Sequence, residues 1–218
     1  MGNLFINYLW QEPFFFFTWV AVVTFSICVH EFLHAYAAYR LGDDTAARAG
    51  HLTLNPLVQM GPSSLVMLAL LGIAWGAVPV QPGRLRTRGA EAAVSFAGPA
   101  ANLVLCVLFG VTAGLLGFVQ AAWVQPFFFF AQLGSMANGV LFLFNMLPVP
   151  MFDGWSVFAL FFPPLRRLGL QQGQLISWVF LLIVFMTPVS GIFWKAGRLF
   201  AHAVMAGTAA AAGLILPH

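Results

Sequence analysis

The chain has 218 residues, of which 61% are hydrophobic and only 7% are charged, with nine Lys or Arg against six Asp or Glu. Soluble domains carry about 25% charged residues, so a soluble globular protein is excluded and lipid must surround most of the chain. The net charge of +3 has no basic face interleaved with stacking aromatic residues, which excludes a nucleic-acid-binding protein. We expect one all-α, polytopic membrane domain over residues 1–218, with about five to six membrane segments.

The membrane segments are predicted from runs without charged residues. The first run continues in a helical pattern to Leu41, where Gly42 provides a stop. The second is short and bounded by prolines, and the uncharged stretch 92–152 is long enough for two crossings. The predicted segments are 14–41, 61–79, 91–119, 126–147 and 168–194, with 199–216 either continuing the last one or forming a short final helix.

The distribution of arginine predicts how these segments are oriented. Pro-Phe-Phe-Phe-Phe occurs at 13–17 and again at 126–130, and we interpret both as helix starts on the same side of the membrane. Arginines lie in the two connections 42–60 and 80–90, which places both connections in the cytoplasm. Residues 61–79 must then enter and leave by one face as a re-entrant element, with the strand-like segment 78–86 after it.

The first helix carries the sequence His30-Glu31-Phe32-Leu33-His34, an HExxH motif. The i, i+4 spacing puts both imidazoles on one helix face, where they can hold one zinc ion beside the carboxylate of Glu31. If the hydrocarbon core begins near Phe14, His30 lies about 24 Å along the helix, inside a core about 30 Å thick. A buried polar network between helices is the alternative, but ionisable groups inside a membrane usually mark function.

Catalytic zinc usually takes three protein ligands, so a third is needed. Asp153 is the best candidate, because it stands at the end of the long uncharged run, where an unpaired carboxylate would be unstable without a cation. Asp153 reaches the depth of His30 and His34 only if the chain crosses an even number of times between them. If 61–79 is re-entrant, only 91–119 and 126–147 cross the membrane between these residues. That is an even number, so the requirement agrees with the arrangement that the arginine distribution predicts.

Three motifs together resemble the site-2 protease family of intramembrane zinc metalloproteases: His30 to His34, Gly98-Pro99-Ala100-Ala101-Asn102, and Asn145-x-x-Pro148-x-x-x-x-Asp153-Gly154. The resemblance covers roughly residues 20–165 and is similar to the short, mostly prokaryotic type without PDZ or CBS domains. It implies one zinc held by His30, His34 and Asp153, with Glu31 as the catalytic base. It also implies Asn145 as an oxyanion or substrate contact. Phe152 departs from the leucine that commonly precedes the Asp-Gly pair.

The sequence therefore predicts a zinc endopeptidase that cuts transmembrane protein or peptide substrates. Zinc-activated water would attack the peptide bond and Glu31 would carry the proton. The motif-bearing core would span about 14–165 and the C-terminal helices about 168–216. By the resemblance the protein lies in a prokaryotic cytoplasmic membrane, and the arginine distribution and the depth of His30 predict a site towards the cytoplasm. The alternative is a catalytically silent family member or a metal-binding membrane protein that uses the same His/His/Asp site.

Overall fold

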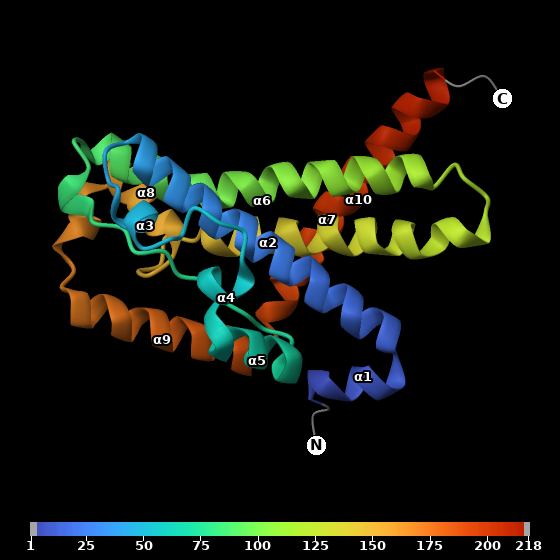
Figure 1. The fold of residues 1–218 in the computed structure, drawn as a ribbon, viewed down its shortest axis with the longest axis horizontal. Coiled ribbons are helices and arrows are strands. Elements are labelled where there is room, and N and C mark those ends of the chain that lie inside the picture. The colour runs from blue at the N-terminus through green and yellow to red at the C-terminus, as the bar shows by residue number, and fades with distance from the viewer. Residues whose placement is uncertain (1–3, 216–218) are drawn as a thin grey trace.

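The structure is a computed structural model that describes residues 4–215, is 78% helical and contains no β-strand in that range. In chain order the elements are η1 (Phe5–Asn7), α1 (Tyr8–Gln11), α2 (Pro13–Arg40), α3 (Thr45–Arg48), α4 (Pro56–Gln59), α5 (Gly61–Leu71), η2 (Pro82–Arg84), α6 (Arg88–Leu116), η3 (Ala122–Val124), α7 (Gln125–Asn145), α8 (Asp153–Phe161), η4 (Pro163–Arg167), α9 (Leu170–Met186) and α10 (Ser190–Ile215). The all-α prediction is confirmed (Figure 1).

Three long helices form the centre of the molecule. The helices α6 and α7 run side by side as an antiparallel hairpin, and both α2 and α10 pack against this pair (Figure 1). Small side chains line the contact between α6, α7 and α10, where Ala113, Ala131 and Ala201 are almost completely buried beside Met205. Because lipid gives no hydrophobic drive for helix association, such close contacts through small residues are how membrane helices pack.

The chain is a membrane protein, and three helices are long and apolar enough to cross a bilayer: α2, α6 and Ala122–Asn145. The bent pair α9 and α10, which meet at 76°, adds a fourth span if the two are counted as one. The expectation of five to six segments is therefore too high. The 11 residues of α5 extend only about 16 Å, and α8 is shorter still, so neither crosses alone. The C-terminal apolar run also breaks earlier than expected, between Met186 and Ser190.

The ends of α2 follow the local sequence. Pro13 occupies its first turn, where the missing N–H costs nothing. At the other end Gly42 has φ of 104° and the N–H of Asp43 donates to the carbonyl of Ala38 at 2.9 Å, an arrangement that closes helices after a left-handed glycine. The two Phe-rich helix starts lie together, because the ring centroids of Phe14 and Phe129 are 5.5 Å apart.

Residues 61–79, predicted to be re-entrant, belong to a segment that folds back on itself. After α4 and α5 the chain turns back, and the N–H of Ala77 donates to the carbonyl of Gln59 at 3.1 Å. The hydroxyl of Ser64 also contacts Trp75, donating to its carbonyl at 2.6 Å and accepting from its N–H at 2.9 Å. The end of this segment therefore lies beside its beginning. The segment 78–86, which was expected to be strand-like, forms no strand: residues 78–81 have no regular secondary structure, and Pro82–Arg84 form the short helix η2.

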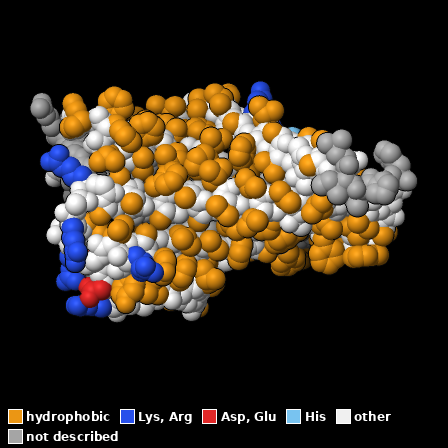
Figure 2. All heavy atoms as spheres, turned by 90° about the horizontal axis from the view of Figure 1, so that it is seen from above, with side chains coloured by type: hydrophobic (Ala, Val, Ile, Leu, Met, Phe, Trp, Pro, Cys, Tyr) orange, Lys and Arg blue, Asp and Glu red, His pale blue; other side chains and the backbone are white. Residues whose placement is uncertain are grey.

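Charged side chains gather at one end of the molecule. Figure 2 shows most Lys and Arg side chains at the left end, while hydrophobic side chains cover much of the remaining visible surface. This is the end at which α2 stops, α3 and η2 lie, and α6 begins (Figure 1). A protein with a charged end and an apolar flank is arranged as expected for a chain surrounded by lipid.

Candidate metal centre

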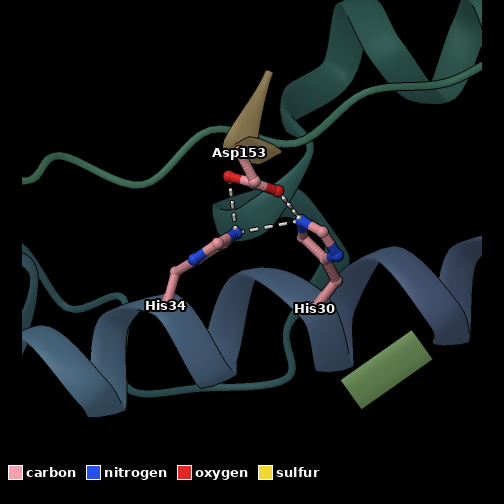
Figure 3. Close-up of side chains that lie close together, drawn as sticks. All are labelled: His30, His34 and Asp153. Atoms are coloured by element: carbon pink, nitrogen blue, oxygen red, sulfur yellow. Dashed lines mark hydrogen bonds and ion pairs between the residues drawn. The ribbon is translucent and has the colours of Figure 1, made fainter. Parts of the chain in front are cut away.

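Two histidines of α2 and one aspartate meet at a single point (Figure 3). The Nε2 atoms of His30 and His34 are 2.9 Å apart, as expected for imidazoles one turn apart on the same helix face. Asp153, the first residue of α8, points its carboxylate at both, with Oδ2 at 3.1 Å from His30 Nε2 and Oδ1 at 3.2 Å from His34 Nε2. The structure therefore brings together residues that are more than a hundred positions apart in the sequence.

The turn before α8 aims Asp153 at the histidines. Met151 has φ of 70°, a left-handed conformation that side chains other than glycine rarely adopt. Phe152 turns away from the cluster and packs on Phe144 of α7 and Phe180 of α9, with ring centroids 4.9 and 6.0 Å apart. The residue that departs from the common leucine therefore fills a gap between helices and leaves Asp153 free to face α2.

Helix α6 passes directly over the two imidazoles at Gly98. A Cβ added there would collide with the Nε2 atoms of both His30 and His34, so this position has no room for any side chain. The close approach lets α6 contact the far nitrogens of the rings. His34 Nδ1 lies 2.8 Å from the Val94 carbonyl, and His30 Nδ1 lies 2.6 Å from Oδ1 of Asn102. Partners of this kind fix the orientation of metal-binding imidazoles.

A cavity of about 350 Å³ opens beside the cluster. It is lined by all five residues proposed from the sequence, including Glu31, which is 8% exposed, and Asn145, the last residue of α7. The backbone of the re-entrant segment runs along one wall, and a Cβ at Gly76 would collide with the carboxylate of Glu31. Other wall residues are Val78, Val80, Pro82, Ser95 and Ser156.

Asp43 links the segment along this side of the cavity to the end of α2 by hydrogen bonds. Its fully buried carboxylate accepts hydrogen bonds from the backbone N–H and hydroxyl of Thr45 at 3.0 and 2.5 Å, and from the N–H of Gln81 at 2.6 Å. Burial alone raises the pKa of Asp43, but these hydrogen bonds and the charge of Arg84 lower the pKa below its ordinary value. No local pattern in the sequence indicates this role of Asp43, because the pairing joins residues 38 positions apart.

The donor set fits a zinc ion. Because the Val94 carbonyl can only accept, His34 carries its hydrogen on Nδ1 and presents a lone pair on Nε2. Two carboxylate oxygens face the same space, so the cluster can offer a cation two imidazole nitrogens and a carboxylate. Ligand atoms about 2.0–2.1 Å from a tetrahedral zinc lie roughly 3.3 Å from each other, close to the separations between these atoms. Two imidazoles and one carboxylate are also a common catalytic zinc set.

Comparison with known proteins gives relatives over most of the chain. A protein named "Putative zinc metalloprotease YwhC", from Bacillus subtilis (strain 168), is 34% identical over 190 residues, which cover 82% of this chain and 86% of that protein. Two proteins named "Putative zinc metalloprotease Rip2" are also similar. The one from Mycolicibacterium smegmatis is 37% identical over 73% of this chain, and that from Mycobacterium tuberculosis (strain H37Rv) is 33% identical over 75%.

The match covers only 62% and 64% of the length of these two Rip2 proteins. No protein-family model matches the chain, and no solved structure matches it. The names of the relatives and the donor set of the cluster agree on the cofactor, which is zinc.

Proposed function

Because the chain belongs to the site-2 protease family of zinc metalloproteases, we propose that it is an intramembrane endopeptidase that hydrolyses peptide bonds within or near transmembrane segments of membrane-protein substrates. One observation carries the proposal: the His30, His34 and Asp153 cluster opens into the same cavity as the carboxylate of Glu31. A metal site without a catalytic function has no need of a carboxylate at that place. We further propose that residues 1–218 act as a single membrane domain.

In this proposal His30, His34 and Asp153 hold one zinc ion per chain. When bound, zinc supplies a Lewis acid that lowers the pKa of a water molecule towards about 7 and polarises the scissile carbonyl. Glu31 takes the proton of the water and passes it to the leaving amine, acting first as base and then as acid. Glu31 is suited to this because it is buried against the Gly76 backbone, which restricts where its carboxylate can point.

Asn145 is proposed to contact the substrate. It lines the same cavity as Glu31, from the end of α7. Its amide can donate to the oxygen that becomes negative during attack, or to the backbone of the substrate strand. Replacement by alanine is expected to lower kcat with zinc content unchanged, because the residue lies outside the ligand set. Zinc content by elemental analysis and cleavage rate together test this assignment.

The site is proposed to lie inside the membrane, towards the cytoplasm. His30 follows Pro13 by 17 residues, or about 25 Å along α2, so it belongs to the far part of a hydrocarbon core about 30 Å thick. Arginine-bearing segments lie at this same end of the molecule (Figure 2). By the positive-inside rule this end faces the cytoplasm, which is the source of the water that hydrolysis consumes.

The wall formed by Val78, Val80 and Pro82 is proposed to bind the substrate. A helical substrate hides its scissile bond, so the segment to be cut must be unwound and extended before it reaches the cluster. An extended peptide needs partners for its backbone groups, and the irregular segment 73–81 runs beside the cavity with no strand partner among residues 4–215. Strand addition along this segment would satisfy both chains.

The proposal is tested by comparing Glu31→Gln with Asp153→Asn in liposomes that contain a single-span model substrate. Glu31→Gln should keep near one zinc per chain and lose cleavage, whereas Asp153→Asn should lose both. Casein in solution, a substrate without a membrane span, should not be cut by the wild type. Zinc bound without cleavage by the wild type would identify a metal-binding membrane protein instead, and unchanged cleavage in Glu31→Gln would refute the role of the base.

A further inference from the structure

A chain of hydrogen bonds leads from the metal centre into the helix bundle. Oδ1 of Asn102 on α6 contacts His30 Nδ1 at 2.6 Å, and Nδ2 of Asn102 donates to Oδ1 of Asn138 on α7 at 2.9 Å. Nδ2 of Asn138 then donates to Ser26 Oγ on α2 at 2.8 Å. All three side chains are completely buried, so neither water nor lipid competes for these bonds. These hydrogen bonds link the three helices α2, α6 and α7.

The direction of every bond is set by two backbone carbonyls. Nδ2 of Asn138 also donates to the Gly134 carbonyl at 2.9 Å, and the Ser26 hydroxyl donates to the Val22 carbonyl at 2.7 Å. A carbonyl only accepts, so the NH₂ group of Asn138 must face Gly134 and Ser26, and its oxygen must face Asn102. Asn102 is then forced to present its NH₂ group to Asn138.

The remaining oxygen of Asn102 faces His30. An oxygen at this place requires a hydrogen on His30 Nδ1, which leaves the lone pair on Nε2, the nitrogen that faces Asp153 (Figure 3). If Asn102 were reversed, its NH₂ group would face Nδ1. The hydrogen of His30 would then lie on Nε2, in the space that the zinc ion must occupy.

His34 needs no second residue to fix the position of its hydrogen, because its Nδ1 donates directly to the backbone carbonyl of Val94. The partner of His30 is a side-chain amide, which can rotate by half a turn and exchange donor for acceptor. Something further away must therefore fix the amide, and among the described residues 4–215 its NH₂ group donates to Asn138.

We propose that Asn138 is a positioning residue that acts through Asn102 to hold His30 with its hydrogen on Nδ1 and its lone pair towards the metal. The inference rests on the proposed metal site but not on the proposed peptide hydrolysis. Ser26 plays a smaller part, because the Gly134 carbonyl orients Asn138 even without it.

The first experiment needs no variant. Protein labelled with ¹⁵N in histidine and loaded with one zinc ion per chain shows by NMR which ring nitrogen carries the hydrogen. His30 and His34, assigned by comparison with His30→Gln and His34→Gln, should both carry it on Nδ1. A hydrogen on Nε2 of His30 in the wild type overturns the proposal.

The second experiment measures zinc affinity by competition with a chromophoric chelator. Asn102→Leu, which keeps the size but not the acceptor, should lose about 10–100-fold in zinc affinity. Asn102→Asp should bind zinc more tightly than Asn102→Leu, since a carboxylate still accepts from Nδ1, although its second oxygen would face the Asn138 oxygen. A residue that only packs the helices would give the reverse order, because aspartate buries a charge.

Asn138→Leu should lose about tenfold in zinc affinity and give two sets of His30 signals as the amide of Asn102 becomes free to turn. The matched control is Ser135→Ala. It removes a different buried hydrogen bond between α7 and α6, in which the Ser135 hydroxyl donates to the Cys106 carbonyl at 2.8 Å. This control should leave zinc affinity and the His30 signals unchanged. Equal losses in Asn138→Leu and Ser135→Ala would show that helix packing alone is responsible, and the proposal would fall.

The two levels of failure are distinguishable. Wild-type protein that binds no zinc would remove the proposed metal centre itself. Wild-type protein that binds zinc, with the affinity and the His30 signals untouched by Asn138→Leu, would remove only the role of Asn138.

Discussion

Replacing Gly98 by alanine adds a single methyl group between α6 and the two imidazoles. The new Cβ would lie 2.6 Å from His30 Cε1 and closer still to both Nε2 atoms. Ordinary carbon contacts are about 3.5–4.0 Å, so α6 or the rings must move by about 1 Å. Zinc sites tolerate deviations of about 0.2 Å in ligand distance, and a 1 Å misplacement in an active site costs about 100-fold in rate.

Gly98→Ala is therefore expected to lose zinc and cleavage together while α2, α6 and α7 remain helical. Zinc per chain, measured by elemental analysis after a fixed chelator wash, is the primary readout, with circular dichroism to confirm folding. Gly89→Ala in the same helix is the matched control, because its added Cβ meets no atom closer than Thr87 Oγ at 3.7 Å. Folded Gly98→Ala protein with one zinc and normal cleavage would refute the close approach of α6.

Three further outcomes are expected. The pKa of Asp43 is lowered in the folded protein, so its carboxylate stabilises the fold above its unfolded pKa of about 3.9 and this contribution disappears as pH falls through the lower folded value. The midpoint of thermal unfolding of Asp43→Asn should therefore lie below that of the wild type near neutral pH, and the gap should close in acid; a constant gap would contradict this. Proline at Val78 or Val80 removes a backbone N–H from the proposed substrate wall and should slow cleavage several-fold without loss of zinc, whereas unchanged cleavage would remove the wall from the proposal. Removing zinc with a chelator should stop cleavage and lower the unfolding midpoint, and one equivalent of zinc should restore both; a midpoint that does not respond would mean that the ion does not bind the folded site.

Composition and local sequence patterns predicted the membrane environment of the protein, the end of its first long helix and the alignment of its two histidines. Its composition required a lipid environment, and the i, i+4 spacing of His30 and His34 put both imidazoles on one face of a helix that ends where Gly42 permits. The two Phe-rich helix starts were expected on one side, and they are in contact. These predictions succeeded because each depends on overall composition or on residues a few positions apart.

The number of membrane segments could not be read in the same way. Apolar runs resemble one another whether they cross the membrane, turn back within it or bend at a proline. The length of α5 and the return of Ala77 to Gln59 show that residues 61–79 turn back. The bend between α9 and α10 shows that the last apolar run is broken.

Only the tertiary structure decided which polar groups meet. Ser26 and Asn138 are 112 positions apart and lie in helices whose apolar residues surround the axis, so hydrophobic periodicity does not reveal which face is turned inwards. A polar residue in such a helix signals a partner but does not identify it. The sequence by itself determined a membrane helix with two histidines in register, whereas the packing of α6 and α7 against it decided how those histidines are held, because hydrogen bonds between helices depend on atomic positions that no local pattern encodes.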